Sequence, residues 1–179
     1  MNILSKIFIC TGITIIPLLI SSCATLTSDI VIESHFASEV NFNNYKSYSW
    51  AGSSKIVFDP IGQWKQPTLD TEDEVKLNIS RELHDKGLIE VHNKPDLLVA
   101  FSAGIDITYL ELIENPDSKE KILTNVPKAA LVIALVDANT GYTVWMGTAE
   151  GDMQQQQNIE NIRARIKYAV SEIFSDYND

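Results

Sequence analysis

The chain has 179 residues, of which 45% are hydrophobic and 21% charged, and its formal net charge at pH 7 is −10. The hydrophobic content and the scattered charge argue against disorder, and the length is ordinary for one domain with a full core. The acidic balance argues against nucleic-acid binding, because the sequence has no cluster of lysine and arginine that could neutralise phosphates.

The first 22 residues have the layout of a secretory signal peptide. Lys6 and the terminal amine supply positive charge, and a mostly apolar, uncharged run follows over residues 7–20. This run is shorter than the roughly 20 residues of a membrane-spanning helix, although an uncleaved helical anchor is the alternative. Residues 19–23, Leu-Ile-Ser-Ser-Cys, then resemble the lipobox of bacterial lipoproteins. The pattern predicts that residues 1–22 are removed and that Cys23 becomes an acylated N-terminus.

Acylation of Cys23 decides both the redox chemistry and the location that we expect. Cys10 leaves with the signal peptide, so Cys23 is the only cysteine of the mature chain and no disulfide forms. Stable anchoring takes two or more acyl chains, and the usual lipoprotein modification supplies three. Ala24 follows the cysteine, where aspartate would signal inner-membrane retention in many Gram-negative bacteria. We therefore expect the inner leaflet of the outer membrane, facing the periplasm, with no cofactor other than the covalent lipid.

Residues 23–28 are predicted to form a short tether, and residues 29–179 a single domain. The first strand pattern begins almost directly after Ser28. Fully extended, the tether spans about 20 Å at most, at ~3.5 Å per residue. The domain is therefore expected to sit against its membrane.

Two strands, a loop and a helix are predicted next. Apolar residues alternate with polar ones over residues 30–36, and residues 45–50 repeat the alternation with aromatics that favour strands. Residues 51–68 contain two glycines and two prolines, which predict a long loop.

The first helix is predicted to begin at Thr71 and to stop at Gly87. Thr71 and Glu74 have the spacing of a capping box, and acidic residues in the first turn suit the helix dipole. Gly87 at the C′ position would bring Leu83 against Leu88, which is the hydrophobic contact of a Schellman motif.

The second half of the chain is predicted to form further strands and a last helix. Residues 137–141, Asp-Ala-Asn-Thr-Gly, are a turn signal that joins two of the strands as a hairpin. Asn158 is the expected cap of the helix, whose apolar stripe extends to Ile173. The expected strands cover residues 88–91, 96–103, 105–113, 129–136 and 142–150. Together the elements predict an α+β fold: a mostly antiparallel β-sheet, with mainly sequential strands paired, and two amphipathic helices packed on one face.

Several blocks of the chain are similar, in order, to those of a known family. Residues 42–50 resemble a block F-x-x-Y-K-T-Y-x-W, and residues 83–88 end in K-G-L. Residues 95–99 read Pro-Asp-Leu-Leu-Val, and residues 137–147 resemble a hairpin D-x-x-T-G…V-W-x-G. In these blocks the chain resembles the bacterial lipoproteins of domain-of-unknown-function family 4136 over nearly all of residues 30–175.

The chain departs from the family pattern at two places, neither of which threatens the fold. Ser47 stands where threonine is usual, and Met146 where a charged residue is common. The resemblance implies an α+β envelope lipoprotein domain. It supplies no catalytic residues to carry over, because the family has no established activity.

The sequence contains few residue patterns that are typical of catalytic or cofactor-binding sites. It contains no phosphate-binding glycine loop and no G-x-S-x-G elbow of a serine hydrolase. Its three histidines, which are His35, His84 and His92, lie in different predicted elements without the spacing of a zinc site. We therefore predict no metal site and no cofactor site.

Three carboxylates and three aromatic residues are the remaining candidates. Asp137, Glu150 and Asp152 could converge at one sheet end as acid–base groups, although a turn and solvated strand ends explain them better. Large aromatics are enriched at interfaces, but they are also ordinary residues at the rim of a core. The aromatic residues in or beside the predicted loop that could form a partner surface are Trp50, Phe58 and Trp64.

We expect a non-enzymatic accessory or structural lipoprotein that acts by contact with another envelope component. It would bind the membrane through its acyl chains and would bind no nucleic acid. One alternative is a carrier or sensor that binds a small apolar ligand between the sheet and the helices. A less favoured alternative is a hydrolase that acts on envelope material through carboxylates.

Overall fold

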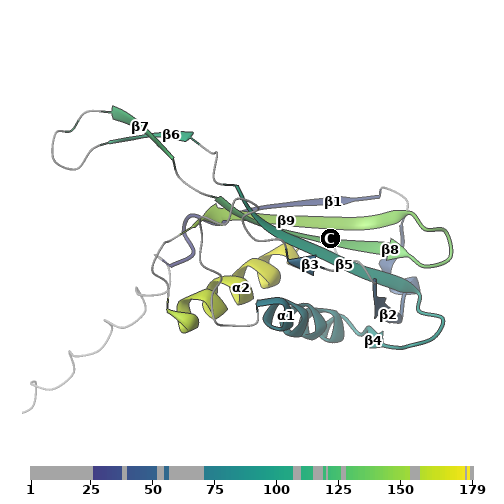
Figure 1. The fold of residues 1–179 in the computed structure, drawn as a ribbon. Helices are drawn as coiled ribbons and strands as arrows, with labels where there is room; N and C mark the ends of the chain where they lie inside the picture. Colours follow the sequence, from purple (N-terminus) through teal and green to yellow (C-terminus); the bar gives the residue numbers. More distant parts are fainter. Residues whose placement is uncertain are drawn as a thin grey trace, which may run out of the picture.

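The computed structural model describes residues 26–37, 40–51, 55–56, 71–106, 110–114, 119, 121–125, 128–153, 158–175 and 177. The predictions for Cys23, Phe58 and Trp64 lie outside these residues. Figure 1 shows one large sheet with both helices on the same side of it. In chain order the elements are β1 (Val31–Phe36), a 3-10 turn (Phe42–Asn44), β2 (Ser47–Trp50), β3 (Lys55–Ile56), α1 (Thr71–Asp85), β4 (Ile89–Glu90), β5 (Leu97–Asp106), β6 (Leu110–Glu114), β7 (Lys121–Asn125), β8 (Lys128–Asp137), β9 (Thr143–Asp152) and α2 (Ile159–Ile173).

The large sheet has seven strands and is built around β8. Its strand order is β1-β9-β8-β5-β2-β4, and β3 pairs with β5 as well. β8 pairs antiparallel with β5 on one side and with β9 on the other, and β1 adds antiparallel to β9. β2, β3 and β4 form parallel pairs. The predicted class is therefore confirmed: an α+β fold with a mostly antiparallel sheet and two helices on one face.

The long strands give the sheet two ends, and different segments of the chain lie at each end. At one end Lys128 lies opposite both Asp106 and Asp152, and we call this the tether end. At the other end Asp137 lies opposite Leu97 and begins the β8–β9 turn, so we call this the turn end. Both helices begin near the tether end and run towards the turn end (Figure 1).

The observed strands differ from the prediction at three places. β3 lies inside residues 51–68, where only a loop was predicted. β5 continues to Asp106, so the predicted strand over residues 105–113 is in fact the end of β5 followed by β6. β7 was not predicted, and it pairs with β6 in a separate two-stranded sheet that projects from the tether end (Figure 1).

The pairing of strands was also predicted too locally. β8 and β9 are sequential neighbours, as expected, but β1 pairs with β9 and β5 pairs with β8 across long stretches of chain. The alternation of apolar and polar residues shows which face of a strand is buried. It does not show which strand lies next to it.

The core lies between the helices and one face of the sheet. The indole of Trp145 is 1% exposed and stacks on Phe174 with 4.8 Å between ring centroids. On the opposite face of the sheet, Leu98, Ala100 and Ala134 are only half-buried. The buried hydrophobic residues of the two helices and of β5 and β8 are Val75, Ile79, Leu83, Ala169, Val170, Ile173, Leu97, Val99, Phe101, Leu131, Ile133 and Leu135.

The local signals at the helix ends are mostly confirmed. The amide of Leu88 donates to the carbonyl of Leu83 at 2.9 Å and Gly87 has a φ of 84°, as the Schellman motif requires. The side chain of Asn158 caps α2 by accepting from the amide of Asn161 at 2.8 Å. The capping box is wrong, because Thr71 is already helical and Glu74 accepts from Arg163 of α2 at 3.1 Å.

Replacement of Trp145 by alanine should lower the free energy of unfolding by roughly 3–5 kcal/mol, because a large buried ring leaves a cavity. The matched control is Tyr142→Ala in the adjacent turn, where the side chain is 76% exposed. This control should change stability by less than about 0.5 kcal/mol. Urea unfolding followed by circular dichroism measures both, and equal stabilities of the two variants would contradict the described core.

Candidate functional site

A network of hydrogen bonds at the turn end joins segments that lie far apart in the sequence. One carboxylate oxygen of Asp96 accepts from the amides of Lys46 and Ser47 at 2.8 and 2.9 Å, and from the hydroxyl of Ser47 at 2.9 Å. The carbonyl of Asp96 accepts from the amide of Ala138 at 2.9 Å. Asp96 therefore connects the start of β2 and the β8–β9 turn to the start of β5.

The carboxylate of Asp137 holds the β8–β9 turn and joins it to Tyr45. Its Oδ1 accepts from the amides of Asn139 and Thr140 at 2.9 and 2.8 Å, and its Oδ2 accepts from the hydroxyl of Tyr45 at 2.9 Å. Gly141 closes the turn with a φ of 74°, a conformation that glycine adopts without strain. The carboxylate is thus occupied with backbone and tyrosine donors.

These contacts shift the pKa values of the groups in the network. Backbone donation, first from Thr140 to Asp137 and from Lys46 to Asp96, holds the pKa of each carboxyl below its usual range. Burial, together with the neighbouring Asp137, raises the pKa of Tyr45 to about 12. Both carboxylates are therefore charged at neutral pH and act as acceptors.

A second polar cluster lies at the tether end and holds the start of the domain. The guanidinium of Arg165 donates to both carboxylate oxygens of Asp29, at 2.7 and 2.6 Å, and to the carbonyls of Leu26 and Asp152. The amide of Asp152 donates to Asp29 at 2.8 Å. We call the contacts of Asp29 and Arg165 the clasp. Hydrogen bonding to Arg165 is the main reason why the pKa of Asp29 is lowered.

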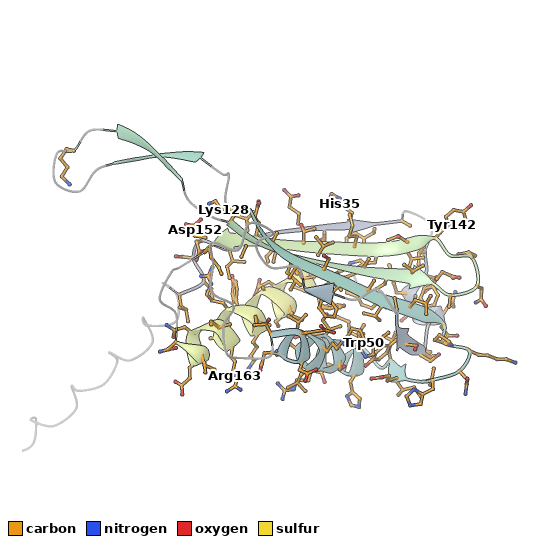
Figure 2. The ribbon with its side chains drawn as sticks, in the orientation of Figure 1. His35, Trp50, Lys128, Tyr142, Asp152 and Arg163 are labelled. Atoms are coloured by element: carbon orange, nitrogen blue, oxygen red, sulfur yellow. The ribbon has the colours of Figure 1, made fainter. Side chains whose placement is uncertain are left out.

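Close packing surrounds the clasp. A Cβ atom on Gly151 would lie 2.8 Å from a guanidinium nitrogen of Arg165 and 3.2 Å from Asp29. The side chain of Arg165 is only 11% exposed, and that of Asp29 only 19%. Beside the clasp, Lys128 forms an ion pair with Asp152, and Figure 2 shows these two residues together at the tether end.

The three carboxylates that the sequence suggested as acid–base groups do not come together. Asp137 belongs to the turn end, whereas Glu150 and Asp152 lie near the opposite end of β9. The long strands separate the two ends by about 30 Å, at ~3.4 Å per residue. Asp152 is paired with Lys128, and Asp137 holds the turn, so each has a structural role in the described fold.

Trp50 is the one member of the suggested aromatic surface that the structure describes. Its ring makes edge-to-face contacts with Tyr48 and Phe101, each with 6.0 Å between centroids. Both partners belong to the buried core, so Trp50 packs at the rim of that core.

The three histidines belong to different segments of the described fold. His35 is on β1, His84 on α1 and His92 follows β4. In the part of the chain that the structure describes, no three His, Cys, Asp or Glu side chains group closely enough to hold a metal ion. Within that same part, no helix is both long enough and apolar enough to cross a membrane.

Sequence reasoning missed the clasp. Arg165 lies one residue before Ile166 in the apolar stripe of α2, and such a charged neighbour signals a buried partner only weakly. Asp29 immediately precedes the strand predicted over residues 30–36 and belongs to no motif. Asp96 and Tyr45 belong to the recognised blocks of sequence, but nothing in those blocks shows that each block binds another.

Comparison with known families and structures supports the fold. The family profile described as "Domain of unknown function (DUF4136)" matches residues 32–177. A DUF4136 family protein from Bacteroides thetaiotaomicron superposes with a TM-score of 0.55 at 12% identity, over 83% of this chain and 96% of that one. None of the curated proteins compared with the chain matches it in sequence.

A second solved structure has a similar fold within a longer chain. A PDZ domain protein from Parabacteroides distasonis superposes with a TM-score of 0.51 at 16% identity, over 88% of this chain. The present chain spans only 40% of the length of that protein. At these identities the likenesses show the fold alone.

The free energy of unfolding should decrease as the pH is lowered below about 4. The reason is that the pKa values of Asp96, Asp137 and Asp29 in the folded state lie below the ordinary 3.8. The unfolded chain then binds more protons than the folded one, so the stabilisation present at neutral pH is lost as pH falls through the lowered pKa values.

Asp96→Asn should reduce this pH dependence and cost about 1 kcal/mol at pH 7, because uncharged acceptors form weaker hydrogen bonds. The control at pH 7 is Asp85→Asn, whose side chain is 80% exposed and which should unfold like wild type. Urea unfolding at several pH values measures both. An unchanged pH profile in Asp96→Asn would rule out its assigned role.

Proposed function

Because the chain belongs to the domain-of-unknown-function family DUF4136, we propose that it is a lipid-anchored envelope protein that acts, without enzymatic activity, by contact with another envelope component. Its anchor would be the acylated Cys23 in the inner leaflet of the outer membrane, with the domain facing the periplasm. The membrane and a second envelope protein are its partners.

The observation that carries this proposal is the position of the clasp in the sequence. Leu26 and Asp29 are bound to Arg165, and Leu26 is the third residue after the cysteine of the lipobox-like segment. A folded domain that starts so soon after an acylated residue would be held at the bilayer surface. A protein in that place can act on neighbours within a short distance of the membrane.

The polar side chains support a role in contact. Asp96 and Asp137 are occupied by backbone amides, and Asp29 is occupied by Arg165 and an amide. General acid–base chemistry needs groups that face a substrate and share a site with one another. The suggested carboxylates are instead divided between the two ends of the sheet.

The packing between sheet and helices favours contact over ligand carriage. A carrier of a small apolar ligand would use the space between these two layers. In the described part of the chain, that space is filled by side chains with no exposed surface, among them Ile79, Leu83, Val99 and Ile133.

Mass spectrometry of the membrane fraction should show a mature chain that lacks residues 1–22 and begins with an acylated Cys23. The matched variant Cys23→Ala should keep the signal segment or appear unmodified, since no other cysteine remains in the mature chain. A soluble mature protein that begins at another residue would disprove the lipid anchor.

Lengthening the tether should weaken contact with a membrane-bound partner. An insertion of about 20 Gly/Ser residues after Ala24 leaves the clasp intact and adds mean reach of roughly 5–6 Å × √n. The local concentration of the domain at its partner falls accordingly. In-cell crosslinks should decrease at constant protein level.

The control for this experiment carries the same residues after Asp179, which adds equal mass but leaves the tether unchanged. Its crosslinks should match those of the wild type. If the long-tether protein keeps every crosslink, membrane proximity is incidental and the ligand carrier becomes the better explanation.

A further inference from the structure

The clasp fixes where the anchored chain leaves the domain. The guanidinium of Arg165 binds Leu26 through its carbonyl and Asp29 through its carboxylate, and both groups are thereby joined to the end of β9. The amide of Ile30 also donates to the carbonyl of Thr27 at 3.1 Å. The segment from Leu26 to Ile30 is therefore part of the folded domain.

The covalent length of the remaining tether is very short. Only Ala24 and Thr25 lie between Cys23 and Leu26. Whatever conformation they adopt, three peptide units span about 10 Å at most, at ~3.5 Å per residue. If the tether were free up to Ile30, seven units would span about 25 Å, and the tether end could move more than twice as far from the lipid.

The clasp lies at one end of the large sheet, the end from which the β6–β7 hairpin also projects. Lys128 and Asp152 mark the tether end in Figure 2, and Tyr142 marks the turn end, at the far side of the sheet. The strands between them are ten residues long, so the two ends lie about 30 Å apart. An anchor within about 10 Å of one end keeps that end close to the membrane, whereas the other end can lie up to about 30 Å farther away.

Exposed apolar side chains lie at the tether end as well. Val31 opens β1 opposite Glu150 and is 62% exposed, and Ile159 opens α2 and is 41% exposed. The basic groups described beside them are paired: Arg165 with Asp29, and Lys128 with Asp152. This end can thus approach zwitterionic headgroups without leaving these cations unpaired.

We infer that the clasp holds the tether end of the domain against the lipid headgroups, so that the β8–β9 turn is the part that can lie furthest from them. This inference rests on the acylation of Cys23 in the proposed function. It identifies a lipid surface as the partner of the tether end, and it leaves the turn end, with the exposed Tyr142, as the end that reaches furthest from the membrane. The β6–β7 hairpin projects on the membrane side.

The test measures the distance of two sites from the lipid. The acylated mature protein, which begins at Cys23, is reconstituted into phosphatidylethanolamine vesicles. These vesicles contain a phospholipid with a nitroxide headgroup. With Cys23 acylated, a single introduced cysteine can be labelled specifically with a fluorophore. The two label sites are Ile159→Cys at the tether end and Tyr142→Cys at the turn end.

Quenching of the label at residue 159 should exceed that at residue 142 several-fold. Arg165→Ala should bring the ratio of the two towards one, because it releases the tether. Arg163→Ala is the matched control on the same helix: it breaks the contact with Glu74 and does not touch the tether, so the ratio should stay as in wild type.

The outcomes separate this inference from the proposed function. Mass spectrometry of the reconstituted protein reports acylation, and an unmodified Cys23 would overturn both. Equal quenching at the two sites in an acylated wild-type protein would overturn the orientation alone, and this comparison does not depend on whether Arg165→Ala folds. A folded Arg165→Ala protein that keeps the wild-type ratio would show that the short tether orients the domain without the clasp, and would overturn the role of Arg165.

Discussion

The pairing of β8 with both β5 and β9 along its length is the constraint on which the rest of the molecule depends. It aligns three ten-residue strands, whose alternate residues supply one wall of the core. The two helices complete that core, because their apolar stripes pack against this face of the sheet. The same register brings Asp137 next to the start of β5 and Asp152 next to Lys128, at opposite ends. A shift of one residue would turn every buried side chain of β8 to the open face.

The two ends of the sheet carry polar networks with different tasks. At the turn end, Asp96 and Asp137 join the start of β2, the start of β5 and the β8–β9 turn, and each of these segments belongs to a sequence block recognised in the family. Those blocks are therefore explained by folding. At the tether end, Arg165 joins the beginning of the domain to its last helix and to β9.

This division of labour gives the proposed contact role a physical basis. A protein held by lipid near its first strand would expose most of its surface to the periplasm. It would meet partners near the membrane more often than partners far from it. The contact of Arg165 with Leu26 and Asp29 shortens the free part of such a tether, and so limits how far the domain could move from the anchor. An effect of this kind needs neither a cofactor nor a reactive side chain.

The sequence by itself determined the local features. Gly87, Leu83 and Leu88 are enough for the end of α1, Asn158 for the start of α2, and residues 137–141 for the β8–β9 turn, because capping and turn geometry involve only neighbouring residues. Apolar periodicity was enough for both helices and for the α+β class, although β3, with two residues, is too short for a pattern. Only the tertiary structure decided the order of the strands, the parallel pairing of β2 with β5, the separation of Asp137 from Asp152, and the contact of Arg165 with Asp29. Each of these joins residues that are distant in sequence, and such contacts depend on how whole elements pack together, which no local pattern records.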